Sequence, residues 1–318
     1  MVIVRITMGL GNQMFQYAAG LSLSKEKNTA LKVDTSSYAG YKLRKYELNT
    51  FFEIDTPEAS KEEVNAVWYN HPVIKFWNKI LPNKKIRALG LPYDEKAVQR
   101  NLLALFDVFY PSHKRKTYVE PHYHYDKDFF SANDNLYLHG FWMSWKYFEK
   151  YDAEIRKAFT VRQELVKHLS STTNYIESEN SVSIHIRRTD YTTPEVIKLK
   201  GLLSLDFFRK GVDYIKQKTG KVTVFVFSDD IPWVKENFRL EGVKVIYVDN
   251  TVSNSAIEDF YLMMKCRHNV ISNSTFSWWA AHLNNNENKI IVAPQRWYAV
   301  SRVNSKDVCP ASWTLMDM

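Results

Sequence analysis

Cysteine is scarce in this sequence of 318 residues, which contains only Cys266 and Cys309. Two cysteines make no disulfide framework and no Cys-X-X-Cys pair, so the sequence favours a reducing compartment. Long apolar runs are also missing, because no stretch reaches the roughly 18 residues that a membrane-spanning helix needs. The first residues lack the apolar core and cleavage site of a signal peptide. We therefore expect a cytoplasmic protein.

Acidic residues are fewer than basic ones: 35 Asp and Glu against 43 Lys and Arg give a net charge of +8. This excess favours an anionic partner, such as a phosphate-bearing ligand, a nucleic acid or an acidic membrane surface. The basic residues are scattered, apart from 84–85 and 114–116, which argues against a nucleic-acid partner. The segment 73–81 combines an apolar helical stripe with lysines, which leaves peripheral contact with the inner face of a membrane open.

Strand-like and helix-like patterns alternate along the chain, which predicts an α/β protein with parallel sheets. Residues 2–34 read as strand, glycine loop, helix and strand, whereas about 55–115 is irregular and basic and reads as an insertion. A Ser- and Thr-rich run after residue 169 is expected to break a helix. We place the domain boundary there, giving domains 1–170 and 171–318 with a cleft available between them.

The second predicted domain is the more regular one. Its strands are expected at 182–186, 222–227, 243–248, 269–272 and 289–292, with helices at 204–218, 231–238, 254–266 and 275–283.

The strongest local feature is the run HIRRTDY at 185–191, which lies at the carboxyl end of a predicted strand. Ligands of open α/β sheets bind outside such strand ends. Arginine can hold phosphate oxygens through two parallel hydrogen bonds. An ion pair between an arginine and Asp190 is the purely structural alternative. Because several polar residues crowd one strand end, we favour a phosphate-bearing ligand.

A second feature is the run NSTFSWW at 273–279, where a strand turns into a helix. Free backbone N–H groups and the helix dipole favour a bound phosphate at such a position. Ser274 and Thr275 are also ordinary helix-capping residues, so capping alone is an alternative.

The glycine loop at 9–13 allows close backbone approach to a ligand. It is an incomplete dinucleotide fingerprint, because Met14 stands where the last glycine belongs, although Asp34 ends the next strand as a ribose-binding acid would. An NAD-dependent oxidoreductase thus remains an alternative. Asp229 and Asp230 follow a strand and precede a helix, so capping is their expected role. With no clear ligand set, we expect no bound metal.

Four segments together resemble the α-1,2-fucosyltransferases of glycosyltransferase family 11. They are 9–18 (GLGNQMFQYA), 140–148 (GFWMSWKYF), 185–191 (HIRRTDY) and 272–279 (SNSTFSWW). The resemblance implies a GT-B-like fold, with two Rossmann-type domains that face each other across a cleft. It also implies an N-terminal acceptor domain, a C-terminal donor domain, a GDP-fucose donor, inversion at the anomeric carbon and no metal or other cofactor.

The resemblance also implies roles for individual residues. It assigns His185, Arg187 and Arg188 to the diphosphate. It assigns contacts with phosphate and fucose to Ser274, Thr275 and Phe276, guanine recognition to Asp259, and closure over the donor from the other domain to Asn12.

For catalysis, Arg187 is expected to stabilise the diphosphate as it leaves. A carboxylate is expected to accept the proton of the acceptor hydroxyl. Asp190 and Glu195 are the candidates by position, although a structural role in the loop remains an alternative for both.

The resulting prediction is metal-independent, inverting transfer of L-fucose from GDP-fucose to the 2-hydroxyl of a galactose residue on a glycan. The acceptor is left open, with a lipid-linked glycan of lipopolysaccharide or oligosaccharide synthesis as one class. The alternatives are the NAD-dependent oxidoreductase and a non-enzymatic module that binds anionic glycan or nucleic acid. The stretch after Asp190 is shorter than the family pattern, which puts acceptor preference in doubt.

Overall fold

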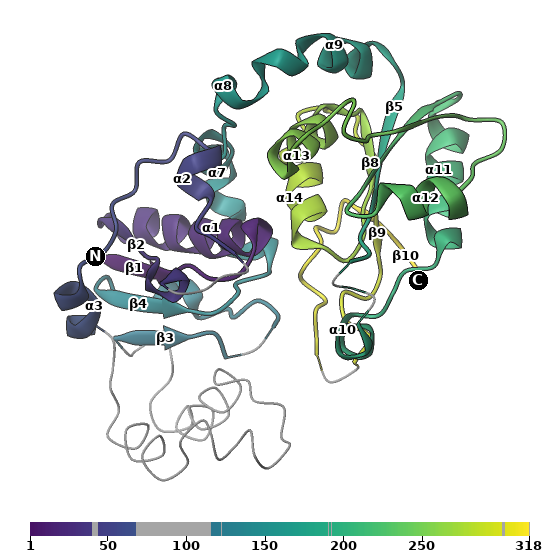
Figure 1. The fold of residues 1–318 in the computed structure, drawn as a ribbon. Coiled ribbons are helices and arrows are strands. Elements are labelled where there is room, and N and C mark those ends of the chain that lie inside the picture. The colour runs from purple at the N-terminus through teal and green to yellow at the C-terminus, as the bar shows by residue number, and fades with distance from the viewer. Residues whose placement is uncertain are drawn as a thin grey trace. The chain divides into compact units, whose positions relative to one another are not determined.

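A computed structural model describes residues 1–39, 44–67, 116–121, 123–189, 191, 193–300 and 303–317. The chain folds into two compact units (Figure 1). The first consists of Met1–Met8, Phe15–Tyr46 and Asp55–Ile155, and the second of Gly9–Met14, Glu47–Ile54 and Arg156–Met318. Most of the predicted insertion and the whole of the segment 73–81 lie outside the described residues.

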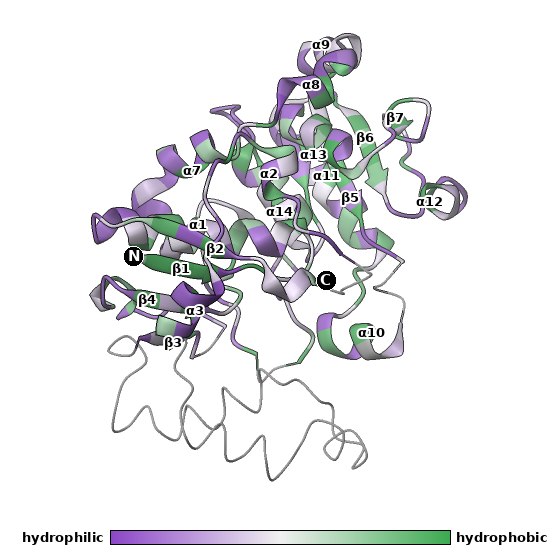
Figure 2. Ribbon diagram, turned by 60° about the vertical axis from the view of Figure 1, so that its left-hand side comes forward, coloured by the Kyte–Doolittle hydropathy of each residue, from purple (hydrophilic) through white to green (hydrophobic). Residues whose placement is uncertain are grey.

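The first unit contains a four-stranded parallel sheet in the order β2-β1-β4-β3. Its strands are β1 (Val2–Arg5), β2 (Leu31–Asp34), β3 (Thr117–Val119) and β4 (Leu136–His139). Its helical segments are α1 (Leu10–Glu26), which begins in the second unit, η1 (Ser36–Tyr38), α3 (Lys61–Val67), η3 (Phe129–Ser131), η4 (Trp145–Tyr147) and η5 (Glu149–Tyr151). The apolar residues of β1 are buried, and the strand is green in Figure 2.

The segment 140–148 contributes two residues, Trp142 and Tyr147, to an aromatic cluster in the first unit. Trp142 is fully buried, with its ring centroid 5.2 Å from that of Tyr147 and 5.3 Å from those of Phe129 and Tyr118. Aromatic rings at such distances contribute packing energy beyond the area they bury. Trp142 and Tyr147 of this family-like segment therefore stabilise the core of the unit.

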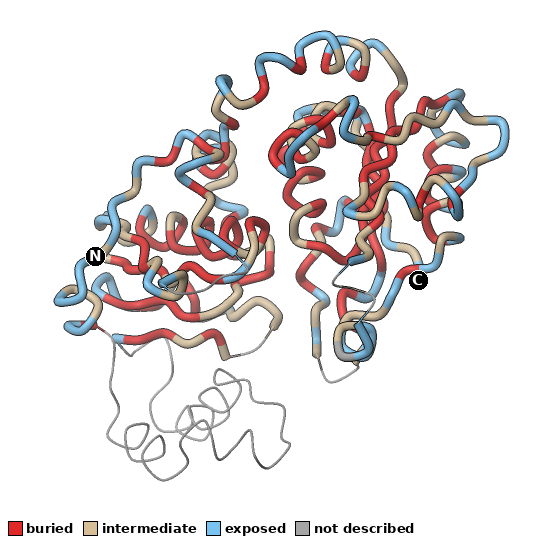
Figure 3. The backbone as a smooth tube through the Cα atoms, viewed as in Figure 1, coloured by how far each residue is buried: buried red, intermediate tan, exposed pale blue. Residues whose placement is uncertain are grey.

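The second unit contains a six-stranded parallel sheet in the order β10-β9-β8-β5-β6-β7. Its strands are β5 (Ser181–Ile186), β6 (Thr223–Ser228), β7 (Lys244–Tyr247), β8 (His268–Val270), β9 (Ile291–Pro294) and β10 (Thr314–Met316). All six residues of β5 are buried, as the red trace in Figure 3 shows.

Four helices join these strands: α11 (Leu205–Thr219), α12 (Ile231–Asn237), α13 (Ala256–Lys265) and α14 (Thr275–Leu283). The chain moves outward from β5 to β6 and β7, returns through α13 to β8 on the other side of β5, and then moves outward again to β9. Connections therefore leave β5 and β8 in opposite directions. In such sheets the carboxyl ends of the two strands flank the ligand crevice.

The described part of the second unit also contains the helices α2 (Leu48–Phe51), α8 (Gln163–Val166), α9 (Ser170–Ser178) and α10 (Pro194–Lys200). The helix α7 (Asp152–Ala158) begins in the first unit and ends in the second. One more short turn, η6 (Lys167–Leu169), lies between α8 and α9. Within the described ranges, no helix is long and apolar enough to cross a membrane.

The structure corrects three sequence expectations. The Ser- and Thr-rich run does not break a helix but forms α9, whose Thr173 and Ile176 are buried. Because α8 and α9 pack against α13, they belong to the second unit, and the change of unit falls at Ile155 rather than after residue 170. The glycine loop at 9–13 is largely helical, since α1 already begins at Leu10.

Candidate active site

His185 lies at the end of β5 and is 5% exposed. Its Nδ1 is 3.2 Å from the hydroxyl of Ser272, which follows β8, and its ring centroid is 5.7 Å from that of Phe276. Burial and then the charge of Arg187 lower the pKa of His185 from 6.5 to about 4. The imidazole is therefore neutral near pH 7 and links the two strands of the predicted crevice.

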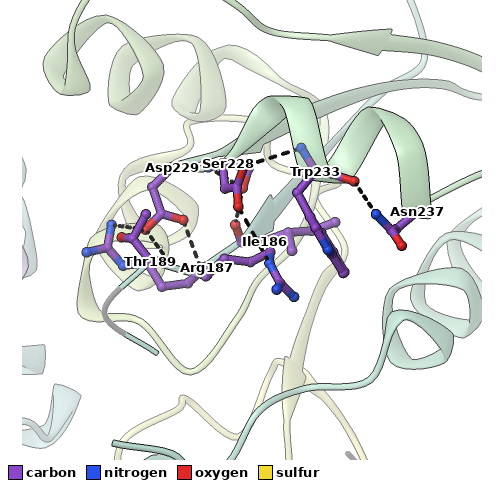
Figure 4. Close-up of polar contacts among 9 residues, drawn as sticks. Ile186, Arg187, Thr189, Ser228, Asp229, Trp233 and Asn237 are labelled. Carbon is purple, nitrogen blue, oxygen red and sulfur yellow. Dashed lines mark hydrogen bonds and ion pairs between the residues drawn. The ribbon is translucent and has the colours of Figure 1, made fainter. Parts of the chain in front are cut away.

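Arg187 and the two residues after it converge on Asp229, which follows the neighbouring strand β6 (Figure 4). Arg187 Nη1 lies 3.2 Å from Asp229 Oδ2. The backbone N–H of Arg188 donates to Oδ1 at 2.8 Å, and that of Thr189 donates to Oδ2 at 3.0 Å. The Thr189 hydroxyl also donates to Oδ2. The sequence analysis left open an ion pair between an arginine and Asp190 as a purely structural alternative. In the structure Arg187 forms an ion pair with Asp229, while Asp190 lies outside the described residues.

Arg188 is held differently from Arg187. Its guanidinium carbon lies 3.3 Å from the centroid of the Trp233 ring on α12, and its Nε is 3.9 Å from a carboxylate oxygen of Asp230. A guanidinium over a tryptophan face is favourable and keeps the cation in place. Asp230 also accepts a hydrogen bond from the backbone N–H of Trp233 at 3.2 Å, which is the predicted helix cap.

A cavity of about 240 Å³ opens at the carboxyl ends of β5 and β8. Its lining combines both arginines with polar groups and with apolar side chains: Ile186, Arg187, Arg188, Tyr191, Leu202, Leu203, Ser204, Leu205, Phe208, Trp233, Ser272 and Asn273. Tyr191 donates its hydroxyl hydrogen to the carbonyl of Asn273 at 2.9 Å and so ties the loop after β5 to the loop after β8. The structure therefore places a cationic cavity where the sheet topology predicts ligand binding.

The helix α14 begins beside this strand end. Ser274 is its N-cap residue and is 8% exposed, but its hydroxyl makes no capping hydrogen bond to the described backbone. Capping therefore does not account for the Ser274 side chain. Thr275 and Phe276 form the first turn and are half-buried. The first N–H groups of a helix have no partner within the helix, which is the chemistry that favours an anion at such a position.

The start of α1 approaches the same turn of α14. A Cβ atom added to Gly11 would lie 2.4 Å from the carbonyl carbon of Thr275 and 2.6 Å from the backbone nitrogen of Phe276. Only glycine permits this backbone approach. Asn12 is the next residue and is half-buried. The structure thus brings the predicted Asn12 segment to the predicted Ser274 segment. Both segments belong to the second unit, whereas Asn12 was expected to approach from the other domain.

Asp259 lies on α13, where the ring of its neighbour Phe260 packs 5.4 Å from that of Phe276. Burial raises the pKa of Asp259 to about 6, a hydrogen bond with Ser253 opposes that rise, and the charge of Glu258 adds to it. Glu258 itself serves the helix cap, since it accepts a hydrogen bond from the backbone N–H of Asn254 at 2.8 Å. A half-buried carboxylate with a raised pKa is typical of a ligand-binding role.

Two predicted residues cannot be placed at the site. Asp190 lies outside the described residues, as does the side chain of Glu195, whose backbone belongs to α10. Their expected role as proton acceptors stays a prediction.

The alternative dinucleotide site required Asp34 as its ribose-binding residue, and the structure gives Asp34 other partners. Asp34 is 6% exposed and accepts hydrogen bonds from the Tyr137 hydroxyl and, at 2.9 Å, from the backbone N–H of Ser36. Both carboxylate oxygens therefore have partners within the first unit. This arrangement explains Asp34 as a structural residue and leaves little basis for a ribose contact.

Sequence reasoning missed two residues of the site, Asp229 and Trp233. Their signal is weak in the sequence, because Asp229 precedes a helix where a cap is expected and Trp233 reads as an apolar helix position. The order of the strands is what identifies Asp229. Because β6 lies next to β5 in the sheet, a residue just after β6 faces the residues just after β5. Over the described parts of the chain, no group of three or more His, Cys, Asp or Glu side chains is arranged to hold a metal ion.

Comparison with known proteins gives a match along nearly the whole chain. Residues 1–317 match the family model described as Glycosyl transferase family 11. The chain is 33% identical over 325 residues to the Alpha-1,2-colitosyltransferase of Escherichia coli, and this alignment covers 99% of each protein. It is 28% identical over 156 residues to the Galactoside alpha-(1,2)-fucosyltransferase 1 of Leontocebus fuscicollis, covering 46% of this chain and 43% of that protein.

Among solved structures, the chain is similar to NodZ alpha-1,6-fucosyltransferase from crystals soaked with GDP-fucose. The TM-score is 0.51 at 17% identity, and the match covers 89% of this chain and 91% of that one. At this identity the likeness is one of fold. It confirms the predicted α/β fold with parallel sheets.

Proposed function

Because the chain belongs to glycosyltransferase family 11, we propose that it transfers L-fucose from GDP-fucose to the 2-hydroxyl of a galactose residue on an acceptor glycan. The observation that carries the proposal is the strand-end cavity lined by Arg187 and Arg188 and by Ser272 and Asn273, the two residues that precede the N-cap of α14. The relatives supply the sugar and the linkage, since one is named as a galactoside α-1,2-fucosyltransferase.

The donor diphosphate would lie against positive groups at this crevice. The guanidinium of Arg187 and the N–H groups at the start of α14 can neutralise the charge that grows on GDP as it leaves. Arg188, fixed on Trp233, adds a second cation to the cavity wall. These groups can supply the charge stabilisation that a metal ion provides in other transferases, so we propose a reaction that needs no metal.

The guanine base would be read by Asp259. An ionised carboxylate can accept hydrogen bonds from N1–H and from the 2-amino group of guanine, and adenine lacks both donors. The half-buried position of Asp259 favours such a directed contact over a solvated charge.

The reaction itself would proceed by displacement at the anomeric carbon. The acceptor 2-hydroxyl attacks C1 of fucose, the bond from C1 to the diphosphate oxygen breaks, and GDP departs from the opposite face with inversion. A carboxylate takes up the hydroxyl proton late in this step. Asp190 and Glu195 remain our candidates for that carboxylate.

A second donor is favoured by one specific observation. The relative with 33% identity over the full length is named as a colitosyltransferase. Colitose is fucose without the 3-hydroxyl, so GDP-colitose carries the same diphosphate and the same base. The contacts proposed for the diphosphate and the base would serve both donors, and we place GDP-fucose first because of the fucosyltransferase relative.

The test is a transfer assay with GDP-fucose, GDP-colitose and GDP-mannose in the presence of EDTA, using a β-galactoside acceptor. We expect transfer from GDP-fucose or GDP-colitose, with GDP released and the new sugar in α linkage to the galactose O2. Product NMR identifies that linkage. An enzyme that transfers only with an added divalent cation, or forms no glycoside from any GDP-sugar, would refute the proposal.

A further inference from the structure

The residue that holds the arginine segment in place is Asp229. We propose that Asp229 is a positioning residue of the donor site: it orients Arg187 and the turn at Arg188–Thr189 so that the guanidinium meets the departing diphosphate. This inference rests on the proposed function for its catalytic consequence, but its structural part stands without it.

The geometry shows that one carboxylate organises three consecutive residues. Oδ1 accepts the backbone N–H of Arg188, and Oδ2 accepts both the backbone N–H and the hydroxyl of Thr189 while also facing Arg187 Nη1 at 3.2 Å. These contacts surround the carboxylate in Figure 4. A side chain that only capped α12 would show none of them, and the cap of α12 is in fact made by Asp230.

The sheet explains why Asp229 reaches these residues. Ile186 of β5 is in register with Ser228 of β6, and the Ser228 hydroxyl donates to the carbonyl of Ile186 at 2.7 Å. The next residue on each strand therefore faces the other, which places Asp229 beside Arg187. The contact is built into the register of two buried parallel strands and does not depend on a surface encounter.

Burial gives this ion pair its strength. The Arg187 side chain is 22% exposed and that of Asp229 is 17% exposed. Burial alone would raise the pKa of Asp229, but the hydrogen bonds from Thr189 and Arg188 and the charge of Arg187 bring it below the usual value. The carboxylate is therefore ionised at neutral pH, and an ionised, desolvated partner directs a guanidinium more strongly than a solvated one.

A neighbouring site provides a matched control. Asp249 follows β7, accepts the backbone N–H of Thr251 at 3.0 Å and its hydroxyl at 2.6 Å, and pairs with Lys235 Nζ at 2.5 Å. It thus repeats the chemistry of Asp229, an aspartate joined to a threonine turn and a cation. Neither Thr251 nor Lys235 lines the cavity.

The central experiment measures kcat and KM for the donor in the wild type, Asp229→Asn, Arg187→Ala, the double variant and Asp249→Asn. The amide introduced by Asp229→Asn must turn its NH2 group toward one of the N–H donors. The turn at Arg188–Thr189 therefore loses at least one of its hydrogen bonds to residue 229. We expect Asp229→Asn to lower kcat by about 10-fold or more with KM changed by less than about 3-fold, since leaving-group charge is greatest in the transition state. Asp249→Asn should leave both within about 3-fold.

The double variant separates positioning from general damage. If Asp229 acts through Arg187, adding Asp229→Asn to Arg187→Ala lowers kcat by no more than about 3-fold. If the loss of kcat in the double variant equals the product of the losses in the two single variants, the inference is overturned. An Asp229→Asn enzyme with kcat within about 3-fold of wild type would overturn it as well.

A second readout judges the inference even if the wild type transfers no sugar, an outcome that would reject the proposed function alone. Amide hydrogen exchange at Arg188 and Thr189 should speed up by about 10-fold or more in Asp229→Asn and stay unchanged in Asp249→Asn. If Asp229→Asn fails to fold, Asp229→Ser is measured in its place with the same expectation. Unchanged exchange at Arg188 and Thr189 would overturn the structural part.

Discussion

Two single residues of the site have pKa values that are shifted in opposite directions, and the two shifts can be measured separately. His185 is a histidine with a lowered pKa of about 4, and Asp259 is an aspartate with a raised pKa of about 6. In the unfolded chain the histidine takes up its proton at a pH of about 6.5 and the aspartate at about 3.9. Between these values the two residues therefore change the stability in opposite directions.

For His185, the unfolded state binds the extra proton first as the pH falls. The stability that depends on a neutral His185 is fully present above a pH of about 6.5 and is lost as the pH drops toward about 4. We predict that moving from about pH 7 to about pH 4.5 removes about 2 kcal/mol of unfolding free energy through this residue. Chemical denaturation of His185→Gln at both pH values should show a decline smaller by that amount. An equal decline in the variant would contradict the burial of a neutral imidazole.

Asp259 bears on ligand binding rather than on folding alone. If its ionised form accepts hydrogen bonds from guanine, GDP affinity should fall by about 10-fold between about pH 7 and about pH 5, because at the lower pH most of the carboxylate is protonated. Calorimetry of GDP with Asp259→Asn is the control, since it includes the titration of the diphosphate itself. We expect weaker binding and a flatter pH dependence in the variant. The same pH dependence in both proteins would remove Asp259 from the base site.

Among single residues, the sequence predicted His185, Arg187 and Arg188 as ligand-binding residues. The ground was that several polar side chains crowd the end of one buried strand, where ligands of α/β sheets bind. The sequence did not predict Asp229, because an aspartate before a helix is explained by capping, and only the strand order shows that β6 lies beside β5. Polar contacts between strands that are far apart in sequence require the register, which one chain's pattern does not reveal.

Among the elements, α14 and the start of α1 make a close backbone approach near the site. Gly11 leaves no room for a Cβ atom against Thr275 and Phe276, and the obstructing atoms belong to the backbone. We predict that Gly11→Ala lowers stability by about 1–3 kcal/mol and also weakens GDP binding, because the first turn of α14 must shift.

Gly220 supplies the comparison for Gly11. It ends α11 with a φ of 85°, and a Cβ atom added to it would have no other atom within 4 Å. Gly220→Ala should cost about 1 kcal/mol through backbone strain and leave GDP affinity unchanged. Thermal unfolding and calorimetry of both variants test this. If Gly11→Ala binds GDP as tightly as Gly220→Ala does, α14 does not hold the diphosphate.

The four helices that join the strands of the second sheet, α11 to α14, were predicted to within about two residues. Three of them have strong caps, since Ser204, Asp230 and Ser255 each accept a hydrogen bond from their helix. The strands β3 and β10 were missed, since three residues are too few to show a period. β4 was missed because all its residues are buried, so polar and apolar positions do not alternate.

For the whole molecule, the expectation of two α/β units with parallel sheets and a GT-B-like fold is confirmed. The expected domain boundary, after residue 170, was less accurate. Nothing in the sequence of the helices before β5 indicates which of the two sheets they pack near. That α8 and α9 pack against α13 follows from tertiary contacts alone. The assignment of donor and acceptor roles to the two units remains a prediction.

At the centre of the proposed function is a crevice beside Arg187 and α14 that binds the diphosphate of a GDP-sugar. The most direct test is calorimetric titration of the wild type and Arg187→Ala with GDP and with NAD, in EDTA. We predict GDP binding that survives the chelator and weakens by about 10- to 100-fold in the variant, the range expected for charge-assisted hydrogen bonds. Binding of NAD without GDP, or equal GDP affinity in both proteins, would contradict this assignment of the crevice.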